Sequence, residues 1–298
     1  MPATVASQVQ QWWETVCLHA EACRQEPRTE TVHQLRTHLR RLRSLADQLR
    51  ADLPQPAVGQ VRSTLRDITG RTGQLRDLDV LIAAEEDWIA LLPPGLEPGG
   101  REVWQHLRRE RQWARELLEG YLAGDLFRDQ CSLLERLLPE IFTDPEGRLD
   151  GLLAARVRRT WRQVAADAAN LDAQSGPEPW HRLRKRAKRL RYGLEAQPGS
   201  KPRRSLLAAL KRLQDRLGAF NDAAVQHALL LRLARDEWSP AALQALGAWR
   251  VLLHQRQVAQ ARRLPAALSR FCGPPNARLL GKVLPQEPQP GSFMKDPG

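Results

Sequence analysis

Two short segments of this chain combine a histidine with closely spaced arginines and lysines. The first runs from His33 to Arg43 and the second from His181 to Arg191, with the same internal spacing at a constant offset (181 − 33 = 148). Neither segment contains an acidic residue, so neither neutralises its own charge. Guanidinium, ammonium and imidazolium groups are donors that suit phosphate oxygens. The pair predicts a duplicated surface that binds polyanions.

Each segment has an apolar and a basic face on a helical wheel of about 100° per residue. Leu35, Leu39 and Leu42 lie on the apolar face of the first. The basic faces consist of His33, Arg36, Arg40 and Arg43 in the first segment and His181, Arg184, Lys188 and Arg191 in the second. A solvated face that only keeps the protein soluble is the alternative, but such faces usually mix both signs of charge. One-sign stripes in register across two copies favour binding.

The composition predicts a helical protein with an acidic partner. The 298 residues can form one large domain or two of ordinary size, and Leu, Ala and Arg dominate. The formal net charge of +12 indicates nucleic acid, an anionic membrane surface or a phosphate polymer as partner. No apolar run approaches the roughly 18 residues of a spanning helix, and residues 1–11 lack the features of a signal peptide. We therefore expect a cytoplasmic protein that does not bind membranes.

Prolines, glycines and apolar periodicity divide the chain into expected helices. In the first half these cover residues 4–25, 29–51 with Thr29 as N-cap, 57–92, 101–121 and 125–141. In the second half they cover 149–171, a basic helix that begins near Pro179 and ends before Pro198, 202–237, and 240–271 with a kink at Pro265. The best boundary lies at 144–147, and 273–298 read as a disordered Pro/Gly-rich tail.

A second block is also written twice. Arg66, Gly73 and Asp77 correspond to Lys211, Gly218 and Asp222 at an offset of 145 (211 − 66 = 145). A glycine inside a helix costs about 1 kcal/mol relative to alanine. Its repetition predicts a close approach at these positions, with tight helix packing favoured over a ligand. The two aspartates are expected to orient neighbouring arginines rather than to catalyse a reaction.

In these four blocks the sequence resembles the CHAD family, the conserved-histidine α-helical domain. The matching motifs are His33-x-Leu35-Arg36 with Arg40-Arg41-Leu42-Arg43, Gly73-x-x-Arg76-Asp77, His181-x-Leu183-Arg184 with Lys188-Arg189-Leu190-Arg191, and Leu217-Gly218-x-x-Asn221-Asp222. The resemblance covers about residues 5–272. It implies an all-α fold of two four-helix bundles related by internal pseudo-twofold duplication, residues 1–146 and 147–272, with a basic surface or channel between them.

The resemblance also implies binding of long-chain inorganic polyphosphate, often at polyphosphate granules, without known catalysis. Relatives often carry an additional triphosphate-tunnel domain, but this chain has no ExExK signature, so we expect a stand-alone form. Lysines and arginines near the two stripes are expected to form walls beside the polymer. The complete candidate set is His33, Arg36, Arg40, Arg41, Arg43, Arg62, Arg66, His181, Arg184, Lys185, Lys188, Arg189, Arg191 and Lys211.

The sequence does not indicate an enzyme. It lacks GxxxxGK[ST], GxSxG and HExxH motifs and a carboxylate cluster suited to magnesium, so we expect no cofactor and no metal. Tryptophans such as Trp12, Trp13, Trp104 and Trp161 fit a helical core better than base stacking.

Two alternatives to a polyphosphate-binding protein stay open at this point. One is a nucleic-acid-binding protein, and the other is a helical scaffold whose basic grooves dock an acidic protein. No nucleic-acid-reading motif accompanies the basic stripes, so we expect nucleic acid to be a weaker, electrostatic competitor. Polyphosphate-associated proteins are further candidate partners.

Overall fold

The computed structural model describes residues 4–144 and 146–284, and in this part of the chain every regular element is an α-helix. The helices up to residue 141 are α1 (Val5–Gln25), α2 (Thr29–Leu49), α3 (Ala57–Arg71), α4 (Gly73–Ile82), α5 (Glu85–Ile89), α6 (Glu97–Ala123) and α7 (Asp125–Ile141). They are followed by α8 (Arg148–Asn170), α9 (Pro177–Glu195), α10 (Lys201–Leu233), α11 (Pro240–Ala261), α12 (Leu264–Cys272) and α13 (Pro274–Val283). The predicted all-α class is confirmed.

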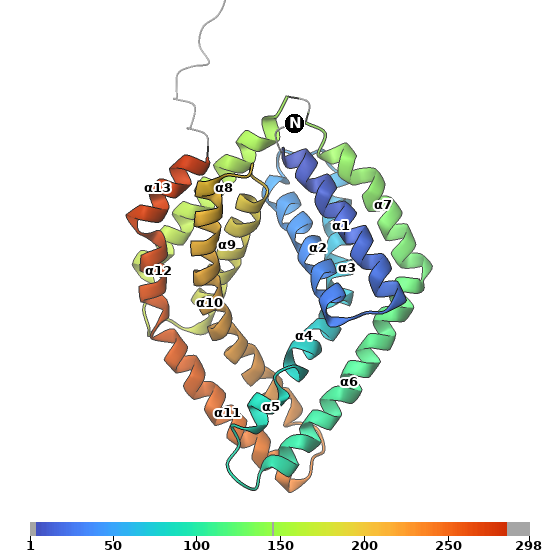
Figure 1. The fold of residues 1–298 in the computed structure, drawn as a ribbon, viewed down its shortest axis with the longest axis vertical. Coiled ribbons are helices and arrows are strands. Elements are labelled where there is room, and N and C mark those ends of the chain that lie inside the picture. Colours follow the sequence, from blue (N-terminus) through green and yellow to red (C-terminus); the bar gives the residue numbers. More distant parts are fainter. Residues whose placement is uncertain (1–3, 145, 285–298) are drawn as a thin grey trace, which may run out of the picture.

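The helices form two groups, each with four helices in which every helix packs on two others (Figure 1). One group contains α1, α2, α3 and α7, and the other contains α8, α9, α10 and α12. The groups touch where α2 packs on α8 and α9, and the chain is joined a second time where α6 packs on α11. The helices α2 and α9 therefore lie at the contact between the groups. The origin of this arrangement by duplication stays a prediction, as do the domain bounds.

The apolar faces predicted for the two basic helices are buried. Leu35, Leu39 and Leu42 of α2 have no exposed surface, and neither do Leu183 and Leu190 of α9. Burying a leucine side chain stabilises the fold by about 1.5–3 kcal/mol. These leucines fix the rotation of both helices, so the basic stripes must face away from the core of each group.

Tryptophans hold the second junction together. Trp88, Trp104 and Trp249 pack edge to face with ring centroids 5.5–6.2 Å apart, and Trp249 Nε1 donates a hydrogen bond to the Trp88 carbonyl. A Cβ at Gly99 would lie 2.2 Å from the Ala241 carbonyl oxygen, so α6 approaches α11 this closely only with glycine there. The tryptophans predicted to lie in the core are buried, which confirms that prediction for Trp12, Trp13, Trp104 and Trp161.

Thr29 is not the N-cap of the first basic helix. The N-cap is Arg28, in an extended conformation, and no side chain caps this end. Thr29 is the first residue of the helix itself.

The single helix predicted over residues 57–92 is also wrong, because the chain breaks at Thr72 and again at residues 83–84. The Thr69 carbonyl, which a continuous helix would offer to the Gly73 N–H, accepts a hydrogen bond from Arg36 Nη1 instead (2.7 Å). A contact from α2 therefore ends α3.

The C-terminal part differs from the prediction at two points. Pro265 lies in the first turn of α12, so residues 240–271 form two separate helices rather than one kinked helix. Part of the predicted disordered tail is the helix α13, which begins with Pro274 and Pro275 and packs on α10 with Leu280 buried. Proline suits a first helical turn because the N–H groups there have no helical partner. Residues 285–298 of that tail lie outside the described residues.

None of the described helices is long and apolar enough to cross a membrane.

Candidate functional site

The basic faces of α2 and α9 come together where these helices meet. The charge of Arg40 on α2 acts on Arg184 and Lys188 of α9, and it also acts on Arg36 and Arg43 of its own helix. Arg40 thus links the two predicted stripes. The structure places them at one site rather than on separate surfaces.

We call Arg40, Arg43, Arg184 and Lys188 the central cluster. No member forms a hydrogen bond or an ion pair through its side chain with another residue in the described part of the chain. Burial is the largest cause that lowers the pKa of Arg43, Arg184 and Lys188. For Lys188, burial together with the charges of Arg40 and Arg184 lowers the pKa to about 7. Half-buried cations that form no ion pair are costly, and a bound anion would reduce that cost.

His33 and Arg36 extend the cluster along α2. Burial lowers the pKa of His33, and the positive charge of Arg76 on α4 lowers it further. Arg36 Nη1 donates to the Thr69 carbonyl at 2.7 Å and to Thr72 Oγ1 at 3.1 Å. Arg36 is therefore held at the junction of α3 and α4.

The close approach predicted at the repeated glycines has a different cause from helix packing. A Cβ at Gly73 would lie 3.3 Å from Arg36 Nη1, so the missing side chain leaves room for a guanidinium. At Gly218 the nearest atom is Asp222 Oδ2 at 4.0 Å, which is ordinary contact. The favoured prediction of tight helix packing is wrong at both positions.

The second histidine has a neutral neighbour. His181 Nδ1 lies 3.0 Å from Asn221 Oδ1, so a proton on Nδ1 is donated to the amide oxygen. Asn221 stands in the sequence where the first half has Arg76 (221 − 145 = 76). The nearby Asp222 raises the pKa of Arg184 and Lys188 against the dominant effect of burial, as expected for a carboxylate beside these cations.

Several other candidate residues are neutralised by acids. Glu195 accepts from Arg41 Nε at 2.8 Å and from Arg191 Nε at 2.6 Å, and only 14% of its side chain is exposed. The guanidinium of Arg62 is paired with Asp47 in the same way. These arginines link helices within the fold, so their charge is largely compensated before any ligand arrives.

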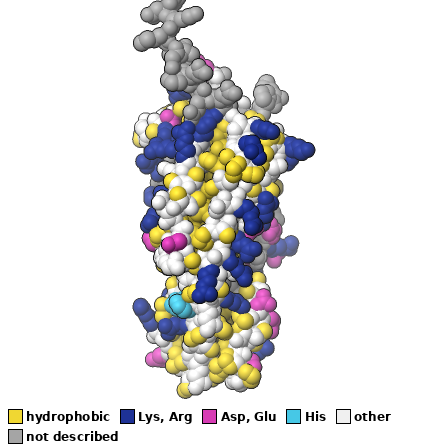
Figure 2. All heavy atoms as spheres, turned by 90° about the vertical axis from the view of Figure 1, so that its left-hand side faces the viewer, with side chains coloured by type: hydrophobic (Ala, Val, Ile, Leu, Met, Phe, Trp, Pro, Cys, Tyr) yellow, Lys and Arg dark blue, Asp and Glu magenta, His cyan; other side chains and the backbone are white. Residues whose placement is uncertain are grey.

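The remaining candidates lie farther out. Arg66, Lys185 and Arg189 are exposed, and exposed Lys211 is paired with Asp215 at 2.9 Å. Lysines and arginines also cover other parts of the molecule: Figure 2 shows them dispersed among apolar side chains on the face that carries α12 and α13. Basic charge alone therefore does not distinguish the site; the central cluster differs because its cations are half-buried and form no ion pair in the described chain.

Sequence reasoning did not select two groups of arginines near the site. Arg76 belongs to the second repeated block, but its counterpart Asn221 is neutral, so the two halves do not share a basic residue at this position. Arg156 and Arg159 of α8 lie within a run of arginines that is not duplicated, so no repeat in the sequence indicates them. In the described part of the chain no group of three or more His, Cys, Asp or Glu residues is arranged to hold a metal ion.

The CHAD domain family model matches residues 6–231, which is well over half of the chain, and the protein therefore belongs to the CHAD domain family. The CHAD domain from the plant Ricinus communis aligns with a TM-score of 0.72 at 22% identity, covering 90% of this chain and 92% of that one. PptA from Streptomyces chartreusis aligns with a TM-score of 0.71 at 18% identity, covering 90% and 99%. At these identities the two structures show a common fold. Comparison with curated proteins gives no match.

Proposed function

We propose that this CHAD domain binds long-chain inorganic polyphosphate through the central cluster and does not catalyse a reaction on it. The observation that carries the proposal is a group of half-buried cations from two helices whose side chains form no hydrogen bond or ion pair with an acid of the described chain. Folding that brings such charges together must be offset elsewhere, and a polyanion offsets it at the site itself. Membership of the family supports polyphosphate as that polyanion.

The arrangement of the cations suits a linear polymer better than a single phosphate. Arg36, Arg40 and Arg43 follow one another along α2, where each helical turn rises about 5.4 Å. Arg184 and Lys188 of α9 lie near Arg40 and add to this row. Each guanidinium offers a planar set of donors to phosphate oxygens, whereas an ammonium supplies a mobile point charge. Successive phosphates of one chain can therefore meet successive cations.

In the cell this activity would target, store or sense the polymer in the cytoplasm, including at polyphosphate granules. Other polyphosphate-associated proteins would then be partners in the same assembly. Nucleic acid would compete only through its backbone charge, because base recognition requires groups that the two stripes lack.

A competition titration tests the proposal. Labelled long-chain polyphosphate is bound to the protein at moderate salt, and unlabelled polyphosphate or duplex DNA is added at equal phosphate concentration. We expect polyphosphate to displace the label at concentrations at least tenfold lower than DNA, because a flexible single chain can follow the cluster and a stiff duplex cannot. Equal or better displacement by DNA would overturn the proposal in favour of a nucleic-acid-binding protein.

A further inference from the structure

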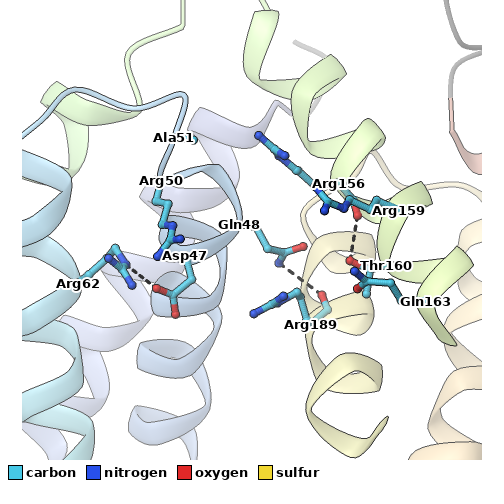
Figure 3. Close-up of a pocket in the computed structure, with 10 residues that line it drawn as sticks. All are labelled: Asp47, Gln48, Arg50, Ala51, Arg62, Arg156, Arg159, Thr160, Gln163 and Arg189. Carbon is cyan, nitrogen blue, oxygen red and sulfur yellow. Dashed lines mark hydrogen bonds and ion pairs between the residues drawn. The ribbon is translucent and has the colours of Figure 1, made fainter. Parts of the chain in front are cut away.

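A hollow of about 490 Å³ lies where the C-terminal end of α2 meets α3, α8 and α9 (Figure 3). Its size is within the roughly 300–1,000 Å³ of small-ligand sites, but such sites are usually apolar. This one is lined by arginines from four helices and their loops: Arg50, Arg62, Arg156, Arg159 and Arg189. The lining includes one carboxylate, that of Asp47, and no aromatic side chain. A small, strongly charged anion fits these walls, and a nucleobase has nothing to stack on.

Only two of the five arginines that line the hollow are paired with an acid of the described chain. Arg62 is paired with Asp47, and Arg156 Nη2 is 3.1 Å from Asp52 Oδ2. The side chains of the other three, Arg50, Arg159 and Arg189, form no hydrogen bond or ion pair with any residue of the described chain. Figure 3 shows these side chains around the opening between α2 and α8. Three guanidinium groups without a partner in the described chain therefore surround one space.

The hollow is not simply a copy of the paired stripes. At the offset of 148, Arg189 corresponds to Arg41 and Thr160 corresponds to Trp12. In the first half the Trp12 ring fills the space beside Arg41, whose guanidinium carbon lies 5.8 Å from the ring centroid. In the second half Thr160 is small and its hydroxyl donates to the Arg156 carbonyl of its own helix (2.9 Å). The space beside Arg189 therefore stays open.

Two arginines of the hollow also differ from the corresponding residues of the first half. Arg156 and Arg159 stand where the first half has Gln8 and Gln11. The second half thus has both the space and the charge that the first half lacks. Asp47, one helical turn beyond Arg43, places the hollow directly after the end of the α2 stripe.

We propose that this hollow binds a compact run of phosphate groups, such as inorganic tripolyphosphate or the terminal phosphates of a longer chain. The inference rests on the proposed function in that the same chemistry is recognised, but it assigns a separate site with its own residues.

Calorimetric titration of tripolyphosphate tests the site. Arg159→Gln installs the residue of the first half and removes an exposed arginine without a partner, so the fold should persist. We expect about tenfold weaker binding, the effect of losing one hydrogen-bonded charge. Thr160→Trp, which fills the space, should abolish binding. The matched control Arg256→Gln removes an exposed charge from α11 and should stay within about twofold of wild type.

Equal losses of tripolyphosphate affinity in Arg159→Gln and Arg256→Gln would overturn the inference. A greater loss of tripolyphosphate affinity in Arg40→Gln than in Arg159→Gln would also overturn it. Long-chain polyphosphate is titrated in parallel. If the polymer binds but Arg159→Gln does not change the affinity for tripolyphosphate, the hollow is not a phosphate site and the proposed function stands. If the polymer does not bind, the proposed function fails whatever the hollow does.

A second series identifies the source of the phosphates. Long-chain polyphosphate with free ends is compared with the same polymer whose terminal phosphates are blocked as phosphoramidates. If Arg159→Gln weakens only the free-ended polymer, the hollow holds the end of the chain. If it weakens neither polymer but weakens tripolyphosphate, the hollow holds a free short oligophosphate.

Discussion

Arg40 and Arg41 are neighbours in one helix, yet they belong to different regions of the molecule. Arg40 lies in the central cluster, where it faces Arg184 and Lys188 without an acidic partner in the described chain. Arg41 binds Glu195 at 2.8 Å and lies over the Trp12 ring. The same division occurs on α9, where Lys188 forms no ion pair in the described chain and Arg191 is paired with Glu195.

The difference between the two regions explains how a basic helix can serve both folding and binding. A guanidinium that is already paired with a carboxylate stabilises the contact between helices and offers little net charge to a ligand. A buried cation without a partner destabilises the free protein and gains most when an anion arrives.

Removing the shared acid should damage the fold rather than the site. Glu195→Gln leaves Arg41 and Arg191 half-buried without a counter-ion, and we expect the free energy of unfolding to fall by about 3 kcal/mol. Urea denaturation measures this loss, with Glu178→Gln as control because that acid is 70% exposed. Affinity for long-chain polyphosphate should stay within about threefold of wild type. A loss as large as that of Arg40→Gln would place the paired arginines in the ligand site.

Polymer binding should weaken as pH rises through the pKa of Lys188. This pKa is about 7, so the side chain is mainly charged at pH 6 and mainly neutral at pH 8. We expect about tenfold weaker binding across that interval if the charged form is required. Lys188→Arg keeps its charge and should flatten the profile. Identical slopes for the two proteins would exclude Lys188 from the site.

The stability of the free protein should change in the opposite direction. The pKa of Lys188 is lowered from 10.5 to about 7 on folding, so between these values the unfolded chain holds a proton that the folded chain lacks. Raising the pH through this window must then favour the folded state. Denaturation at pH 7 and pH 9 should show a gain in the wild type that is smaller in Lys188→Met. An equal gain in both would contradict the buried, unpaired state of Lys188.

The smallest changes in polyphosphate affinity are expected for exposed residues outside the central cluster. Arg66 and Lys211 are exposed, and solvent and salt screen exposed charges over about 8 Å at physiological ionic strength. Arg66→Gln and Lys211→Gln should each change polyphosphate affinity by less than about twofold. A larger effect in a direct titration would extend the site beyond the central cluster.

The sequence predicted what depends on local periodicity. The apolar faces of both basic helices, the stripes opposite them and most helix ends follow from spacing, proline and glycine. It could not show which arginines are paired, because their partners are distant in the chain: Glu195 is 154 residues from Arg41. The break at Thr72 has the same origin, since Arg36 reaches it from another helix. The helix α13 is stabilised by packing on α10, a contact that its Pro/Gly-rich composition does not reveal.

In the proposed function the central cluster, rather than net charge, binds the polymer. The most direct test compares Arg40→Gln/Lys188→Gln with Arg256→Gln/Arg262→Gln, two exposed arginines at α11, so that both variants lose the same formal charge. Affinity for long-chain polyphosphate is measured at one moderate salt concentration. We predict about a hundredfold loss for the first variant, from two charge-assisted contacts of about 1.5 kcal/mol each, and less than about threefold for the second. Equal losses would contradict the account.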